Sequence, residues 1–158
     1  MPPKKDDGKV CGGCGRVIAQ LSRSLGMTDS DAIGPSRNFL EQAMAITPVA
    51  RRLVQSMHRA DQFIVAAIRN NPAVLGDVTL AMARAAEFAE LILAAPGSAT
   101  DRLKLPRITE RSFRRSIKGL RKASQNKKFH KELDFLEVEL KRWSGQTVAQ
   151  VRARFLKR

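Results

Sequence analysis

The spacing of apolar residues predicts a protein that is almost wholly α-helical. After Pro48, apolar side chains recur at alternating steps of three and four residues as far as Asn70, which is the repeat of a helix with one buried face. Thr47 and Pro48 mark its start, because a threonine hydroxyl can cap the first turn and proline lacks only an N–H that would be unbonded there. The same signals recur at Asn71 and Pro72, so a second helix should follow directly.

This second helix is apolar around most of its circumference, which is typical of the central helix of a bundle. Shorter stretches elsewhere in the chain show the same helical spacing. They cover about residues 17–25, 39–46, 109–123, 127–143 and 148–155. Thr109 is expected to cap the third of these, and residues 124–126 should form a short turn. No alternating pattern indicates a strand, so we expect an all-α bundle of four to six helices.

Composition divides the chain into four parts. Residues 1–14 are polar and rich in glycine, and are expected to be a flexible tail that carries a cysteine pair. Residues 15–96 should form a near-neutral helical core, and residues 97–108 a linker. Residues 109–158 should form a basic helical hairpin followed by a short terminal helix.

Positive charge is concentrated at the C-terminal end. The chain has a net charge of +14 and an isoelectric point near 10.9. Residues 11–100 have a net charge of only +1, whereas residues 101–158 hold 18 basic and 6 acidic residues, a net charge of +12. Charge of one sign at this density repels itself and favours an acidic partner, which could be nucleic acid, an anionic membrane or an acidic protein.

The most distinctive chemistry is a row of cations on the predicted hairpin. Six of them fall at steps of three and four, opposite Phe113, Ile117 and Leu120, and three more continue through the turn. The nine are Arg111, Arg114, Arg115, Lys118, Arg121, Lys122, Lys127, Lys128 and Lys131. Like charges four residues apart destabilise a helix by about 0.2–0.5 kcal/mol per pair. Phosphates would remove this repulsion and release counterions on binding. A solvated face that only maintains solubility is the alternative interpretation.

The aromatic residues narrow the kind of nucleic acid. The chain has no Tyr, one Trp and seven Phe, and most of the Phe lie on apolar stripes. Proteins that bind single strands stack bases on exposed aromatic rings. Contact with the phosphates of duplex DNA or structured RNA is therefore favoured over base stacking, and no recognition-helix motif indicates sequence-specific readout.

Cys11 and Cys14 form a C-x-x-C pair within a glycine-rich turn. Two thiolates could supply two of the four ligands of a zinc ion, with the others coming from His58, His130 or a second subunit. The pair could also be a thiol–disulfide motif, although no βαβ pattern accompanies it, or two idle thiols in a tail.

Nothing in the sequence indicates catalysis. His58 lies beside the apolar stripe of its helix, and His130 precedes Asp134 by one turn, which an ordinary pairing of side chains four apart explains. Glycine-rich phosphate loops, a Ser–His–acid set and paired carboxylates are all missing. We therefore expect a non-catalytic protein without a cofactor, although Cys11 and Cys14 could supply two ligands to a zinc ion.

The leading hypothesis is a nucleic-acid-binding protein that contacts phosphates through its basic helix. A second hypothesis is a structural or adaptor subunit that binds an acidic protein or forms a homo-oligomer, because the helix after Pro72 is so apolar. A third is attachment to an anionic membrane surface through the amphipathic basic helix. No stretch is long and apolar enough to span a membrane. A soluble protein in the cytoplasm, in the nucleoid or at another nucleic-acid-associated site, is expected.

Overall fold

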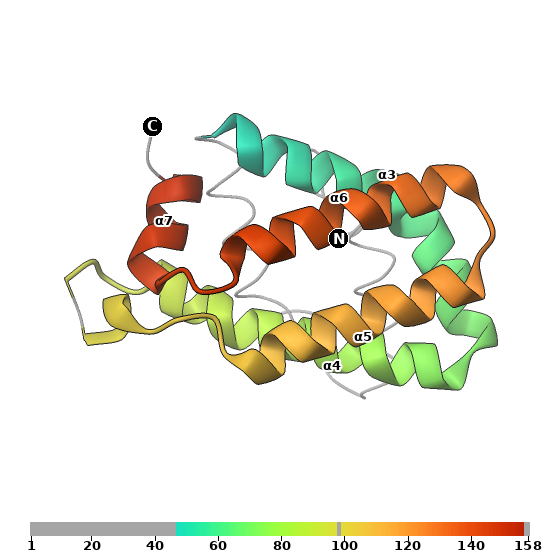
Figure 1. The fold of residues 1–158 in the computed structure, drawn as a ribbon, viewed down its shortest axis with the longest axis horizontal. Coiled ribbons are helices and arrows are strands. Elements are labelled where there is room, and N and C mark those ends of the chain that lie inside the picture. Colours follow the sequence, from blue (N-terminus) through green and yellow to red (C-terminus); the bar gives the residue numbers. More distant parts are fainter. Residues whose placement is uncertain (1–46, 98, 157–158) are drawn as a thin grey trace, which may run out of the picture.

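The computed structural model describes residues 47–97 and 99–156, and within these ranges the protein is built from α-helices (Figure 1). The elements are α3 (Pro48–Asn70), α4 (Pro72–Leu93), the 3-10 helix η1 (Ala99–Arg102), α5 (Arg107–Ala123), α6 (Lys127–Trp143) and α7 (Val148–Leu156). The described residues include no strand longer than a single bridge between Lys104 and Thr147. The predicted all-α bundle is confirmed. Cys11 and Cys14, and the helices predicted before Thr47, lie outside the described residues.

The four long helices α3 to α6 form an up-down-up-down bundle (Figure 1). They lie in two layers, α3 beside α6 and α4 beside α5. The contact of α4 with α5 is the most extensive, and the contacts of α3 with α4 and of α5 with α6 join the layers. The short helix α7 lies across one end of the bundle, where it packs on α4, η1 and α3.

Local signals set the boundary between α3 and α4. The Thr47 hydroxyl accepts a hydrogen bond from the Ala50 N–H at 3.3 Å, which confirms it as the cap of α3. One residue, Asn71, separates the two helices. Unlike Thr47, Asn71 forms no side-chain capping hydrogen bond with the helix that follows it, so this part of the prediction is wrong. Its side chain instead donates to the Ala67 carbonyl at 2.9 Å and so completes the end of α3, while Pro72 opens α4.

The boundaries of the hairpin differ from the prediction at one point. Helix α5 begins at Arg107, after Pro106, so Thr109 is a buried residue inside the helix rather than its cap. The φ angle of proline suits the start of a helix. The helix therefore begins two residues closer to the N-terminus than predicted. The turn at residues 124–126 is confirmed, since the Asn126 side chain accepts from the N–H groups of Lys128 and Phe129 and starts α6.

The hydrophobic core draws on both sides of the linker. One cluster joins Ile68 and Val78 of α3 and α4 to Phe129 and Leu133 of α6. The other joins Ile92 of α4 to residues of α6 and α7, and its Phe155 is fully buried. The hairpin and terminal helix thus complete the same core as α3 and α4.

A buried arginine fastens α7 to the end of α4. The Arg152 side chain donates to the carbonyls of Ile92 at 2.8 Å and Leu91 at 3.2 Å, two groups that the last turn of α4 leaves without partners within the helix. It also pairs with Asp101 of η1 at 2.7 Å. The hydrogen bond from Arg152, followed by one from the Gly97 N–H, lowers the pKa of Asp101. One guanidinium therefore joins three elements.

Changing Arg152 to Ala should destabilise the fold. The substitution removes a buried cation and leaves two carbonyls and Asp101 without their partner, so we expect the free energy of unfolding to fall by about 2–4 kcal/mol. Urea denaturation followed by circular dichroism measures it. The matched control is Arg102→Ala, because Arg102 is exposed and forms no ion pair within the described residues. Equal losses in the two variants would show that the contacts of Arg152 do not stabilise the protein.

Candidate nucleic-acid interface

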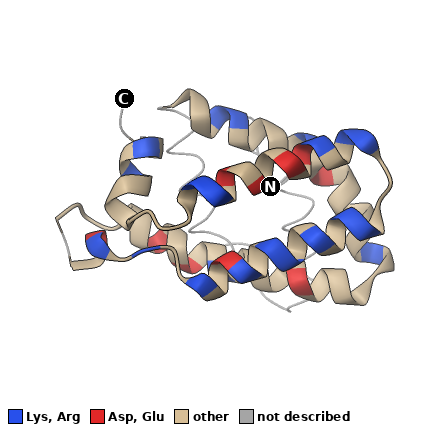
Figure 2. Ribbon diagram, in the orientation of Figure 1, with Lys and Arg blue, Asp and Glu red and all other residues tan. Residues whose placement is uncertain are grey.

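Five cations form one exposed row along α5. A helix turns by about 100° per residue, which places Arg107, Arg111, Arg115, Lys118 and Lys122 within about 80° of one another, over a length of about 22 Å. All five side chains are exposed, and none forms an ion pair with another described residue. We call these five residues the α5 stripe. Lys and Arg recur along the length of this helix in Figure 2.

Two of the predicted cations lie beside this row on α5 and are neutralised. Arg114 pairs with Glu110, one turn earlier, at 2.7 Å. Arg121 faces α6 and pairs with Asp134 at 2.6 Å and with Glu137 at 3.0 Å. Partial burial alone would lower the pKa of Arg121, but the hydrogen bonds and charges of the two acids outweigh it and raise the pKa. Arg121 therefore links α5 to α6, and the charge of Arg114 is balanced within α5 itself.

The remaining three predicted cations stand at the start of α6. Lys127, Lys128 and Lys131 are exposed and form no ion pair with the described residues. The first turn of α6 holds no acidic residue. A helix N-terminus is already positive because its N–H groups are unpaired, so lysines there are unfavourable and strengthen the positive potential. Seven of the nine predicted residues are therefore free to contact an anion.

Arg107 was missed by the sequence analysis. The helix was expected to begin at Thr109, which left Arg107 in the linker, whereas α5 begins at Arg107. It precedes Arg111 by four residues and therefore lies on the same face of the helix. Two features of the sequence could have placed Arg107 in the row. Pro106 favours a helix start directly after it, and Arg107 and Arg111 are four residues apart.

Packing holds the α5 stripe outward. On the opposite side of the helix, Ile117 and Leu120 are buried in the core. Ser112 and Ser116 are also buried, and Gly119 approaches Val74 of α4, so small side chains favour the close packing of α5 on α4. Rotating the stripe inward would bury unpaired charges, which costs several kcal/mol.

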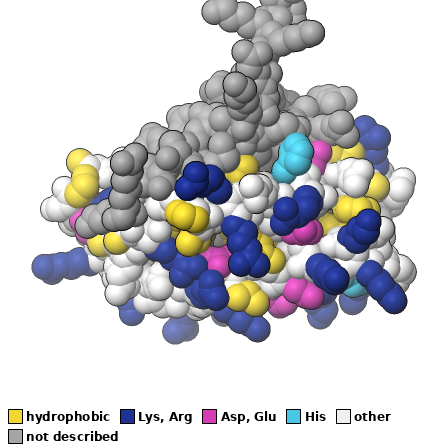
Figure 3. Space-filling model, turned by 90° about the horizontal axis from the view of Figure 1, so that it is seen from above, with side chains coloured by type: hydrophobic (Ala, Val, Ile, Leu, Met, Phe, Trp, Pro, Cys, Tyr) yellow, Lys and Arg dark blue, Asp and Glu magenta, His cyan; other side chains and the backbone are white. Residues whose placement is uncertain are grey.

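The face over α3 and α6 differs in its charge pattern. Seen from above the bundle, acidic side chains are interleaved with Lys and Arg (Figure 3). On this side Arg59 pairs with Glu132 at 2.6 Å, and the Ser56 hydroxyl donates to the same carboxylate at 2.5 Å. Burial alone would raise the pKa of Glu132, but the hydrogen bonds from Arg59 and Ser56 outweigh it and lower the pKa. Charge of a single sign is therefore a property of the α5 stripe and not of this face.

His130 contacts the protein backbone in the turn before α6. The Nε2 atom of His130 lies 2.5 Å from the Ser124 carbonyl oxygen, so it ties the turn to α6. The expected pairing of His130 with Asp134 is wrong, because Arg121 takes Asp134 instead. His58 is exposed on α3. No group of three or more His, Cys, Asp or Glu side chains that could hold a metal ion occurs in residues 47–97 and 99–156.

Comparison with known proteins gives no match for this chain, whether with family models, curated proteins or solved structures. None of the described helices has the length and apolar character needed to cross a membrane.

The Glu132 ion pair should make stability sensitive to acid. Because the folded-state pKa is lowered, the unfolded chain takes up the proton first, and the stabilisation is lost as pH falls below about 4.5. Glu132→Gln should reduce the free energy of unfolding at pH 7 by about 1 kcal/mol, since Arg59 is largely exposed. The gap between wild type and variant should narrow as the pH falls below about 4.5. Urea denaturation at each pH measures it, with Glu87→Gln, an exposed change on α4, as control. A gap that does not narrow at all as the pH is lowered below 4.5 would contradict this assignment.

Proposed function

We propose that this protein binds nucleic acid through its phosphate backbone, using the α5 stripe together with Lys127, Lys128 and Lys131. The observation that carries the proposal is the row of five exposed cations on one face of α5 that no described acid neutralises. The helix that carries the stripe is fixed because its other side is buried in the core. The spacing of the five residues along the helix is thus set before a ligand arrives.

The dimensions of the stripe suit a nucleic-acid strand. Its length of about 22 Å equals about six nucleotides along one strand of a duplex, at 3.4 Å each. Every phosphate that a cation neutralises releases condensed counterions, which drives binding and makes it depend on salt. The three arginines can in addition donate two parallel hydrogen bonds to a single phosphate. The cost of holding like charges side by side in the free protein is removed at the same time.

The aromatic side chains favour backbone contact over base stacking. Phe129 and Phe155 are fully buried, and none of the described aromatic rings is exposed. Rings that pack in the core cannot receive unstacked bases. Duplex DNA or structured RNA, which presents phosphates along a regular surface, is the class of ligand that this interface fits.

A salt series with matched variants tests the proposal. The nuclease-treated protein would be titrated against labelled duplex DNA and structured RNA from low to moderate salt. In the stripe variant Arg107, Arg111, Arg115, Lys118 and Lys122 are all changed to Gln. With five phosphate contacts removed, the slope of log affinity against log salt should become less steep by about 4 to 5.

The control variant loses the same charge elsewhere. It changes Arg51, Arg69, Arg102, Lys104 and Lys141 to Gln, five exposed cations that form no ion pair within the described residues. It should keep most of the wild-type slope. If both variants weaken binding equally, net charge and not the stripe is responsible. If poly-glutamate binds the wild type as tightly as nucleic acid does, an acidic protein becomes the better partner.

A further inference from the structure

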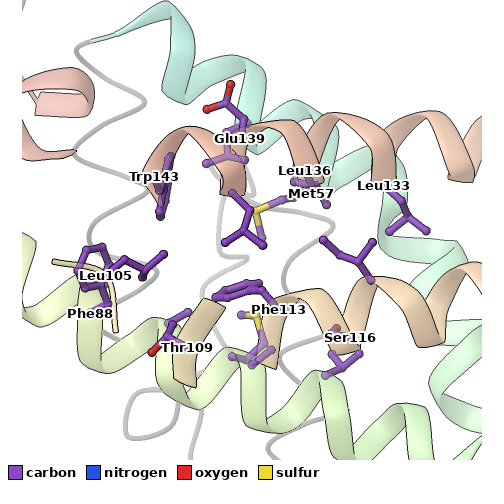
Figure 4. Close-up of a pocket in the computed structure, with 18 of the residues that line it drawn as sticks. Met57, Phe88, Leu105, Thr109, Phe113, Ser116, Leu133, Leu136, Glu139 and Trp143 are labelled. Carbon is purple, nitrogen blue, oxygen red and sulfur yellow. The ribbon is translucent and has the colours of Figure 1, made fainter. Parts of the chain in front are cut away.

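The two layers of the bundle leave an apolar slot between them. A cavity of about 210 Å³ lies between the layer of α3 and α6 and the layer of α4 and α5. Met57, Leu136 and Trp143 line it from one side, and Phe88, Leu105 and Phe113 from the other (Figure 4). On α4 its wall extends from Val78 to Ile92, a distance of about 21 Å along the helix. The slot is therefore long and narrow.

The lining of the slot calls for an apolar occupant. Nearly all of its side chains are aliphatic or aromatic, and the carboxylate of Glu139 is occupied by Arg142 and Arg154. Side chains that border an empty space lose their packing contacts, and a void of this size costs a large part of the stability of a small domain. A four-helix bundle normally closes such a space by bringing its layers together. The separation of the layers indicates that something packs between them.

The chain itself provides a suitable segment. Forty-six residues precede Thr47, outside the described residues, so this step uses their sequence alone. Residues 17–25 carry Val17, Ile18, Leu21 and Leu25 within about 100° of one helical face. Ala19 and Arg23 fall on the opposite face. A helix with this pattern has one apolar face, and burial of that face is the main interaction that can fix the helix to the rest of the protein.

The position at which the described chain begins, and the length of chain before it, both allow residues 17–25 to reach the slot. Thr47 is buried, its hydroxyl donates to the Phe155 carbonyl at 3.1 Å, and Leu53, less than two turns further on, already lines the slot. With residues 39–46 helical, as the sequence predicts, residues 26–46 can still extend over about 55 Å. That exceeds the length of α3, about 35 Å, so residues 17–25 can reach any point of the slot. We propose that the slot is the docking site for the apolar face of residues 17–25 of the same chain.

This proposal is independent of nucleic-acid binding and is tested on the free, full-length protein. Leu21→Glu places a charge on the apolar face, and Ala19→Glu adds the same charge to the opposite face. Trp143 is the only tryptophan of the chain and lines the slot, so its fluorescence reports on the occupant. Leu21→Glu should lower the midpoint of thermal unfolding by about 5–10 °C and shift the Trp143 emission to longer wavelength. Ala19→Glu should change neither.

A milder pair of variants covers the case in which Leu21→Glu fails to fold. Leu21→Ala should lower the midpoint by a smaller amount, whereas Ala19→Ser should leave it nearly unchanged. Equal effects within each pair would overturn the proposal. It would also fail if organic extraction of the wild-type protein released an apolar molecule and shifted the Trp143 emission, since the slot would then hold a ligand. A dimer in light scattering that Leu21→Glu converts to a monomer would assign the slot to the segment of a second copy.

Discussion

The packing of α5 between α4 and α6 is the constraint on which most of this structure depends. Ile117 and Leu120 leave water only if α5 turns that side toward the core, and helix geometry then places the α5 stripe on the outside. The arrangement cannot rotate, because every cation that moved inward would need a partner that the core does not contain. Burial of apolar surface thus determines where the positive charge is displayed.

The neighbours of α5 decide which of its cations remain available. Arg121 lies on the flank that faces α6, where Asp134 and Glu137 meet it. Arg115 lies on the outer face and meets no described acid. An arginine between two carboxylates links helices, whereas one in water remains free to exchange its hydration for phosphate. Arg121 is paired and Arg115 is not because the two residues point in different directions from the helix.

The two ends of the bundle are held together by different means. At one end the α5–α6 turn and the single residue between α3 and α4 keep the layers close. At the other, α7 joins the layers through Arg152, which binds the end of α4, and Arg154, which binds Glu139 of α6. Between these ends the layers are separated by the slot, so α5 carries exposed cations on its outer face and lines the slot with its inner face.

Much of this could be predicted from the sequence, because the relevant interactions are local. Helical periodicity, the Thr47–Pro48 and Asn71–Pro72 boundaries and the turn at residues 124–126 depend on residues within one or two turns of each other. The cationic face of α5 was visible for the same reason, apart from Arg107, which depended on where the helix begins. The sequence did not show that Arg114 is neutralised within its own helix, although Glu110 was in range.

Only the tertiary structure could decide the rest. Arg121 and Asp134 are 13 residues apart and meet across two helices, and Arg152 reaches carbonyls that lie 60 and 61 residues earlier. The slot depends on how two layers of helices are spaced, which no single segment encodes. The sequence by itself determined which residues become helical and which face of each helix is polar, because those properties follow from neighbours along the chain. Which charges are cancelled and where space remains depend on contacts between distant segments, and these are set only when the helices pack.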